Sequence, residues 1–502
     1  MAAAVQDDRS LISLDALNQH NSKTDCWIAV HSKVWDITDF INEHPGGPSV
    51  LLKVAGSNAT QLFDSVHAPD IIEELPKEKF MGYLDEPSSD GPATAATVDE
   101  AKDTPPPAEA SSSLDDEGIP RLETIISAPD FEAAASKGMA HKTWAFYSSA
   151  ATDLVTHRKN KELVRRIMLR PRVLRNVLNV NYETTILGFK SSAPFFISPA
   201  AMARLVHPDG ELALSRGAAN EGIIQCISSN ASYTLRSIVT AAPPDQPFFF
   251  QLYINSERQK TIEILRSARE LGIKAIFVTV DAPVPGKREA DEKAAQATTI
   301  RSAISGGESS KDKKGSGLGR LMAQYIDKSL AWEDLTWIRE ASGVPIVLKG
   351  VQTADDVKTA VEYGVDAVLL SNHGGRSLDG AQASILVLLE LRKQCPEVFE
   401  KLEVYVDGGF ERGSDILKAL ALGARAVGIG RPFLYSLLYG QEGVEQLSQI
   451  LKDELETSMR LAGVRTLEEA TAKLVNTRDI DHLVASEDDY ADVKPRPRPW
   501  KL

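Results

Sequence analysis

Residues 366–379 read DAVLLSNHGGRSLD and begin with a short apolar run, Ala367 to Leu370, whose length suits a buried strand. Two glycines then separate His373 from Arg376, so the backbone can turn sharply and both side chains can point into one space. Histidine accepts a proton near neutral pH, and arginine grips a carboxylate through two parallel hydrogen bonds. The stretch indicates chemistry at a carbon next to a carboxylate. A surface turn without such a role is the alternative that it leaves open.

Apolar runs of this kind recur eight times in the second half of the chain, and helical stretches such as 353–363 and 414–422 separate most of them. The runs cover residues 194–198, 223–228, 247–253, 275–281, 345–349, 367–372, 403–407 and 425–430. Eight strand–helix units predict an α/β fold, a (β/α)8 TIM barrel. Residues 286–320 interrupt the series with GKREADEKAAQ and GGESSKDKKGSG, which indicates a mobile loop over the site.

Polar residues end seven of these runs, where the carboxyl ends of barrel strands form the active site. They are Ser228, Gln251, Tyr253, Thr279, Asp281, Lys349, His373, Arg376, Asp407, Gly408, Gly409, Gly430 and Arg431. The last two groups follow the seventh and eighth runs, where barrels often bind phosphate through backbone N–H groups and a cation. The alternative is a barrel that is not an enzyme and whose strands end in polar residues only because strand ends are commonly polar.

The composition narrows the class of protein. A chain of 502 residues is too long for one ordinary core and predicts two or more domains. Cys26, Cys226 and Cys395 lie far apart and form no metal-binding pair, which fits a reducing compartment. No apolar run approaches the length of a membrane span, and residues 1–10 do not resemble a leader.

The net charge of −14 argues against nucleic acid as the main partner. Residues 1–86 carry 14 acidic and six basic side chains, and residues 87–118 carry eight acidic side chains and one basic side chain. The net charge of the remaining residues is close to zero. A small basic protein would be drawn to this acidic front. The charge alone equally fits a front segment whose acidic residues serve only to keep the protein soluble.

The front segment, residues 8–85, contains two histidines in distinctive surroundings. His44 lies in FINEHPGG and His67 in FDSVHAP. Two neutral imidazoles can ligate a haem iron from opposite sides and leave no open position for a substrate, which favours electron transfer. The motifs DCWI, VWDIT, HPGG, AG, AT and FDSVH together resemble a cytochrome b5 domain. The resemblance implies b-type haem held by His44 and His67.

A segment rich in Pro, Ala, Ser and acids, residues 86–120, follows this domain. It has almost no large apolar residue and predicts a flexible linker. Residues 121–490 form the predicted barrel domain and residues 491–502 a C-terminal tail. The linker would let the front domain visit both a neighbouring cofactor and an external partner.

The barrel segment is similar to the family of FMN-dependent α-hydroxy-acid oxidases and dehydrogenases. The matching motifs are SNHGGRSLDG, VTVDAP, FFQLY, VLKG, DGGFERGSDILKALALGA and GIGRP. With a cytochrome b5 domain in front, the chain resembles the flavocytochrome b2 group, cytochrome-linked L-lactate dehydrogenases. The resemblance implies FMN and haem b as cofactors and oxidation of an L-2-hydroxy acid, L-lactate or a relative. Electrons would pass through the haem to cytochrome c or a similar acceptor.

Residue by residue, the resemblance implies His373 as the base, for either the carbon-bound or the hydroxyl proton, with Asp281 stabilising its imidazolium. It implies substrate binding by Arg376, Tyr253, Arg288 and Asn230. Lys349, Ser228, Gln251, Thr279 and Ala200 would contact the flavin, and Asp407, Gly408, Gly409, Gly430 and Arg431 would line its phosphate end.

Four residues depart from the family pattern. Phe146 replaces a tyrosine that touches the substrate carboxylate, Ala200 replaces a threonine beside the flavin, and Asn230 replaces an apolar residue of the substrate pocket. The polar Asn230 suggests an acid larger or more polar than lactate. Glu411 replaces an arginine near the phosphate, so FMN binding would weaken unless Arg412 or Arg431 compensates.

Two other functions stay open at this point: an FMN-dependent oxidase that passes electrons to O2, and a non-catalytic flavin and haem relay. The resemblance further implies a homotetramer and a place in the mitochondrial intermembrane space. Because no leader is visible, the cytoplasm is the other expected location.

Overall fold

The computed structural model describes residues 11–41, 44, 48–60, 62–63, 72, 75–85, 118–294, 300–309 and 317–485. Backbone contacts divide the chain into two units, residues 1–107 and 108–502. Residues 86–117 of the predicted linker, the C-terminal tail and His67 lie outside the described residues. In the described part, no helix has the length and apolar character that crossing a membrane requires.

In its described residues, the first unit is a small mixed sheet with two short α-helices. Its strands are β1 (Leu11–Ile12), β2 (Asn21–Ser22), β3 (Asp25–Val30), β4 (Lys33–Asp36) and β5 (Phe80–Leu84), in the order β1-β5-β4-β3-β2. The helices are α1 (Leu14–Asn18) and α2 (Pro48–Val54). His31 and Ser32, both with positive φ, form the two-residue turn that a tight β3–β4 hairpin requires. Buried apolar residues such as Ile28, Trp35 and Ile41 form the core of this unit.

The second unit is a closed barrel of eight parallel strands, as predicted. The strands are β9 (Phe195–Ile197), β10 (Ile224–Ser228), β11 (Phe248–Leu252), β12 (Ala275–Thr279), β15 (Ile346–Val351), β16 (Ala367–Leu370), β17 (Glu403–Asp407) and β18 (Ala426–Ile429). β18 pairs with β9 and closes the barrel. β16 ends at Leu370, two residues before its predicted end, because the chain turns there toward His373, whose φ is +59°.

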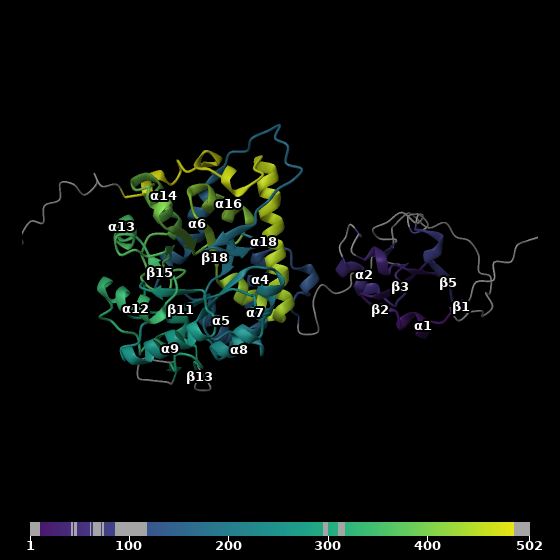
Figure 1. Cartoon of the computed structure of the whole chain (residues 1–502), viewed down its shortest axis with the longest axis horizontal. Coiled ribbons are helices and arrows are strands. Elements are labelled where there is room, and N and C mark those ends of the chain that lie inside the picture. The colour runs from purple at the N-terminus through teal and green to yellow at the C-terminus, as the bar shows by residue number, and fades with distance from the viewer. Residues whose placement is uncertain are drawn as a thin grey trace, which may run out of the picture. The chain divides into compact units, whose positions relative to one another are not determined.

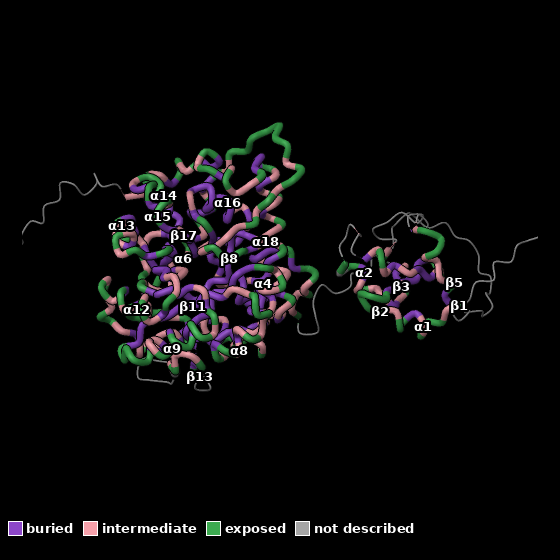
Figure 2. Tube along the Cα trace, in the orientation of Figure 1, coloured by how far each residue is buried: buried purple, intermediate pink, exposed green. Residues whose placement is uncertain are grey.

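Alternating side chains of these strands fill the barrel with rings. Phe196, Phe249, Phe277 and Tyr405 are fully buried inside it. Phe277 stacks on Phe249 and Tyr405, and Phe196 meets Phe277 and Tyr405 edge-on. Figure 2 shows buried segments in the interior of this unit and exposed ones toward its outside. The barrel is therefore a packed core, and ligands have to bind at the ends of its strands.

Helices surround the barrel and follow its strands along the chain (Figure 1). They are α7 (Gly210–Asn220), α8 (Leu235–Thr240), α9 (Arg258–Glu270), α12 (Leu335–Ser342), α13 (Ala354–Glu362), α14 (Ser384–Gln394), α15 (Val398–Lys401), α16 (Gly413–Leu422), α17 (Arg431–Ser436) and α18 (Gly440–Ala462). Three helices precede it: α4 (Ala128–Gly138), α5 (His141–Ser148) and α6 (Val155–Arg166). The described parts of the interrupting segment form α10 (Glu289–Lys293), β13 (Ile300–Arg301), β14 (Glu308–Ser309) and α11 (Leu318–Met322).

Candidate active site

A cavity lies at the carboxyl ends of the barrel strands, with an empty volume of about 1460 Å³ that includes its open mouth. Of the site residues predicted for the barrel, it is lined by His373, Arg376, Tyr253, Lys349, Arg288, Asn230, Ala200, Ser228, Gln251, Asp407, Gly408, Gly409, Gly430 and Arg431. Thr279 and Asp281 lie directly behind this wall and bond to Gln251 and His373. The structure thus brings together residues at the carboxyl ends of all eight barrel strands, with Ala200 following β9.

His373 and Asp281 form a hydrogen-bonded pair at the wall of the cavity. His373 Nδ1 lies 2.9 Å from Asp281 Oδ1, and the Asp281 side chain is completely buried. Tyr253 Oη lies 3.3 Å from His373 Nε2. Because Nδ1–H donates to the carboxylate, the lone pair of the ring belongs to Nε2, where a general base needs it.

Burial lowers the pKa of His373 below its usual 6.5, although the nearby Asp281 carboxylate acts in the opposite direction. Burial also opposes ionisation of Asp281, but the charges of His373 and Lys349 and the His373 hydrogen bond offset it and lower the pKa of this carboxyl. The resting pair is therefore a neutral imidazole beside a carboxylate. That combination can accept a proton and stabilise the resulting imidazolium.

Two arginines approach the ring of Phe146 on one side of this pair. The guanidinium carbons of Arg288 and Arg376 lie 5.7 and 5.8 Å from the ring centroid. Arg376 Nη2 donates to the carbonyl oxygens of Phe146 and Tyr147. Arg288 Nε is buried and has no partner among the described residues. Two guanidinium groups in a buried wall demand an anion, and a carboxylate matches their geometry.

A chain of hydrogen bonds connects three strand ends on another wall. Ser228 Oγ donates to Gln251 Oε1 at 3.2 Å, and Gln251 Nε2 donates to Thr279 Oγ1 at 2.9 Å. Lys349 Nζ lies 3.3 Å from Ser371 Oγ and 3.9 Å from Asp407 Oδ2. The wall therefore presents hydrogen-bond donors and acceptors in fixed positions and one buried cation, Lys349. These groups can bind the polar edge of a planar heterocycle.

The cavity ends at a glycine turn that presses on α6. Gly409 has a φ of +91°, and a Cβ there would lie 2.4 Å from the Asn160 carbonyl carbon, so other side chains do not fit. Beside it, Arg431 donates to His157 Nδ1 at 3.0 Å and to the Gly374 carbonyl oxygen at 3.0 Å. Burial and the Arg431 charge lower the pKa of His157 to about 3, so this imidazole stays neutral.

These features fit FMN. The cavity carries a glycine cradle with Arg431 at one end and the hydrogen-bonded wall with Lys349 at the other. Ser198 Oγ and Asp407 Oδ1 are buried and lack partners among the described residues, so they are available to a bound ligand. Residues of the Asp407, Gly430 and Ser228 strand ends would hold it.

The strand-end pattern missed three cavity residues of α6: His157, Asn160 and Lys161. They occupy positions i, i+3 and i+4 of one helix and thus share one face. That spacing of polar side chains was the available signal.

Asn230 is held by Ser305, from the interrupting segment, and by Tyr325, which follows that segment. Ser305 Oγ donates to its Oδ1 at 2.5 Å and Tyr325 Oη donates at 3.1 Å. Both hydroxyls therefore fix the orientation of the amide, and its Nδ2 donors are directed away from them. The structure makes Asn230 a rigid polar element of the cavity wall.

In the first unit, His44 follows a 3-10 turn, Thr38–Phe40. Its ring is half-buried and lies edge-on to Phe40, with 5.8 Å between centroids. Beside it lies the apolar core that includes Ile41 and Leu51. This setting fits a porphyrin, which needs an imidazole next to an apolar surface. The second predicted ligand, His67, lies outside the described residues.

Comparisons with known proteins agree with this organisation. The pattern of the FMN-dependent dehydrogenase family matches residues 135–477, and that of the cytochrome b5-like heme/steroid binding domain matches residues 13–85. The chain is 41% identical to L-lactate dehydrogenase (cytochrome) of Wickerhamomyces anomalus over 93% of this chain and 80% of that protein. It is 40% identical to the protein of the same name from Saccharomyces cerevisiae, with the same coverage.

Solved structures give the same result. A flavocytochrome b2 double mutant with pyruvate bound superposes with a TM-score of 0.66 at 40% identity, over 76% of this chain and 95% of that one. Mandelate oxidase with (S)-4-hydroxymandelic acid gives 0.65 at 32% identity, over 70% and 98%. The chain therefore belongs to the FMN-dependent dehydrogenases, and among them to the flavocytochrome b2 group, in which a cytochrome b5-like domain precedes the flavin barrel.

Proposed function

We propose that this enzyme oxidises an L-2-hydroxy acid, L-lactate or a close relative, to the 2-keto acid and passes the electrons to cytochrome c. The observation that carries the proposal is the His373–Asp281 pair, 2.9 Å apart, in one cavity with Arg376 and Lys349. A base, a carboxylate clamp and a flavin site in one enclosure are what dehydrogenation of a 2-hydroxy acid requires.

His373 Nε2 takes the proton that leaves the acid, and Asp281 stabilises the imidazolium through Nδ1. Tyr253 Oη, 3.3 Å from the same Nε2, directs a hydroxyl toward the reacting carbon. Burial of the pair excludes water, which strengthens each of these interactions.

Arg376 binds the substrate carboxylate, and Arg288 adds a second positive charge from the interrupting segment. The carbonyl oxygens of Phe146 and Tyr147 fix the Arg376 guanidinium before the substrate arrives. A fixed guanidinium loses little entropy on binding, so the clamp contributes to orientation as well as affinity.

Ser228, Gln251 and Thr279 bind the flavin edge, and Lys349 supplies a positive charge beside it. When bound, FMN would supply the two-electron acceptor for the acid and the one-electron donor for haem b. Glycines 408, 409 and 430 with Arg431 hold the phosphate. Ala200 lines the same cavity without adding a hydrogen bond from its side chain.

By the family resemblance, His44 and His67 would ligate the haem of the front domain. We propose the limits 8–85 for this domain, with a linker at 86–120, a barrel domain at 121–490 and a tail at 491–502. The acidic front attracts a basic acceptor such as cytochrome c. We further propose a homotetramer, in the cytoplasm or the mitochondrial intermembrane space.

Anaerobic mixing of the purified protein with L-lactate tests the proposal. The flavin should bleach first and the haem should then be reduced, and added cytochrome c should be reduced in turn. Bleaching without haem reduction, with rapid reoxidation by O2, would indicate an oxidase. If no 2-hydroxy acid bleaches the flavin, the chain is a relay without catalysis. His373→Gln serves as the matched control and should abolish bleaching.

A further inference from the structure

Glu411 places a negative charge at the end of the cavity where an anionic phosphate is expected. It follows the Gly408–Gly409 turn, lines the cavity and is 10% exposed at its side chain. An unpaired carboxylate here would repel a phosphate at short range. The neighbouring cations therefore decide whether this end of the cavity attracts or rejects an anion.

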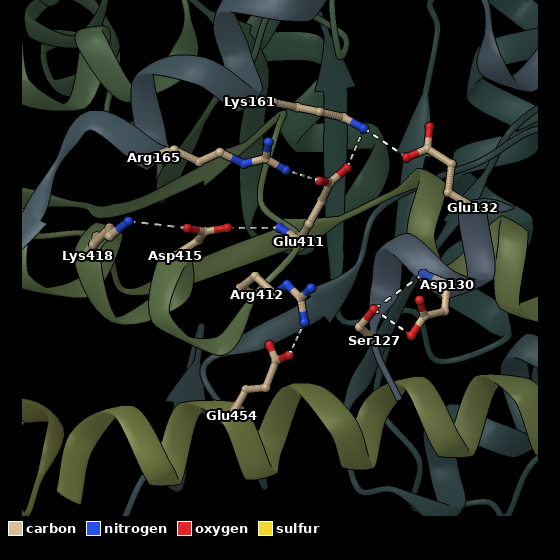
Figure 3. Close-up of polar contacts among 10 residues, drawn as sticks. All are labelled: Ser127, Asp130, Glu132, Lys161, Arg165, Glu411, Arg412, Asp415, Lys418 and Glu454. Carbon is tan, nitrogen blue, oxygen red and sulfur yellow. Dashed lines mark hydrogen bonds and ion pairs between the residues drawn. The ribbon is translucent and has the colours of Figure 1, made fainter. Parts of the chain in front are cut away.

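Two cations of α6 pair with Glu411 (Figure 3). Lys161 Nζ lies 2.5 Å from Glu411 Oε1, and Arg165 Nη2 lies 3.2 Å from Oε2. Asp415 Oδ2 accepts the Glu411 backbone N–H at 3.3 Å and fixes the loop. The pairing with Lys161 and Arg165 is what keeps this charge from standing alone.

The two arginines that the sequence suggested as compensation bond elsewhere. Arg412 Nη1 lies 2.6 Å from Glu454 Oε1, on α18 (Figure 3). Arg431 donates to His157 and to the carbonyl oxygens of Tyr147, Ser149 and Gly374. The cations that pair with Glu411 thus come from α6, a helix that precedes the barrel. Arg412 bonds outside the cavity, whereas Arg431 lines it, so compensation by Arg431 stays a prediction.

Lys161 is the inner cation of the α6 pair. Its side chain is 24% exposed against 64% for Arg165, and it lines the cavity, whereas Arg165 does not. The backbone at Asn160 and Lys161 packs directly on Gly409, so the side chain starts beside the glycine cradle. Glu132 Oε2 lies 2.9 Å from Lys161 Nζ on its other side.

We propose that Lys161 is a phosphate-binding residue of the FMN site and that Glu411 is the positioning residue that holds its ammonium there. An ammonium has three N–H donors, of which Glu411 and Glu132 take two, so one remains for a phosphate oxygen. Together with Arg431, Lys161 supplies the second positive charge that a phosphate dianion needs. The inference rests on the proposed flavin function and adds the residue that replaces the missing arginine.

The test compares FMN with riboflavin, which lacks the phosphate, by flavin fluorescence titration of the full-length chain after removal of its flavin. Lys161→Met should weaken FMN binding by about 10- to 100-fold, the range of one charge-assisted hydrogen bond, and leave riboflavin binding unchanged. Unchanged riboflavin binding also reports an intact fold. Should Lys161→Met not fold, Lys161→Gln takes its place.

Lys159→Met is the matched control, because Lys159 lies on the same helix and pairs with Glu162 at the surface, 3.0 Å away. It should leave both flavins unaffected. When Glu411→Gln is already present, adding Lys161→Met should weaken FMN binding by a smaller factor than Lys161→Met does in the wild type. The reason is that the glutamine no longer holds the Lys161 ammonium beside the phosphate. An unchanged preference for FMN over riboflavin in Lys161→Met overturns the assignment of Lys161, and equal costs in both backgrounds overturn the role of Glu411. Failure of the unaltered chain to bind either flavin would instead refute the proposed function.

Discussion

His373 Nδ1 donates to Asp281 Oδ1 over 2.9 Å, although 92 residues separate the two side chains in sequence. β12 and β16 end on the same face of the barrel, so their loops bring the base and its carboxylate together. Asp281→Asn keeps the shape and removes the charge. We expect kcat to fall by roughly 100-fold or more, within the range of general-base catalysis.

The same variant should also change the pH profile, which a purely structural defect would not do. Asp281 raises the pKa of His373 while burial lowers it, so removing the carboxylate lowers this pKa further. The acidic limb of kcat/KM should therefore move to lower pH in Asp281→Asn. A lower rate with an unmoved limb would show that Asp281 does not act on His373.

A second prediction concerns the pH dependence of the unaltered enzyme. Burial lowers the pKa of His373 below 6.5, and the neutral imidazole is the active form. Activity should therefore be complete above pH 6.5 and should fall only as the pH drops through the lowered value. Initial rates of flavin bleaching in the stopped flow measure this limb without interference from later steps. A limb above 6.5 would contradict a buried neutral base.

The sequence predicted most of the barrel and of the site because both follow from local rules. Eight apolar runs of strand length became the eight strands, and the polar residues after them meet at one end because parallel strands share a direction. The ends of the strands were predicted less exactly. β16 ends at Leu370 because the turn toward His373 begins there, and the apolar pattern of the sequence does not mark the start of that turn.

The contribution of α6 could not be predicted in this way. Asn160 and Lys161 reach the cavity because the backbone of α6 packs on Gly409, almost 250 residues away in sequence. The spacing of its polar residues indicates that they share one helix face, but it does not indicate that this face packs on a glycine turn of the barrel. For the same reason the sequence suggested Arg412 or Arg431 as the compensating cation, whereas the structure pairs Glu411 with Lys161 of α6.

The carboxylate clamp gives a third prediction. Arg376→Lys keeps the charge but loses the planar fork, so KM for the acid should rise by about 10- to 100-fold. Substrate titration of flavin bleaching measures it. Arg412→Lys is the control, because Arg412 pairs with Glu454 outside the cavity and should leave KM unchanged. Equal effects of the two variants would rule out Arg376 as the clamp.

Asn230 should set a preference among acids. Ser305 and Tyr325 occupy its Oδ1, so the remaining amide hydrogens can bond an acceptor on the side chain of the substrate. We expect acids with a hydroxyl or carbonyl at C3 or C4 to have higher kcat/KM than aliphatic acids of equal size. Asn230→Leu should reverse this order by about 10-fold, the worth of one hydrogen bond. An unchanged order across a panel of acids would remove Asn230 from substrate recognition.

The electron route gives the last prediction. His44→Ala should abolish the haem spectrum and the reduction of cytochrome c, because an axial ligand is lost. Flavin bleaching by the acid should persist, since the His373–Asp281 pair belongs to the other unit. His20→Gln is the control within the same unit: His20 stacks on Trp27, with 3.5 Å between centroids, and bonds to Asp25. It should retain haem and cytochrome c reduction. If His44→Ala still reduces cytochrome c at the full rate, electrons leave the flavin directly and the front domain is not on their path.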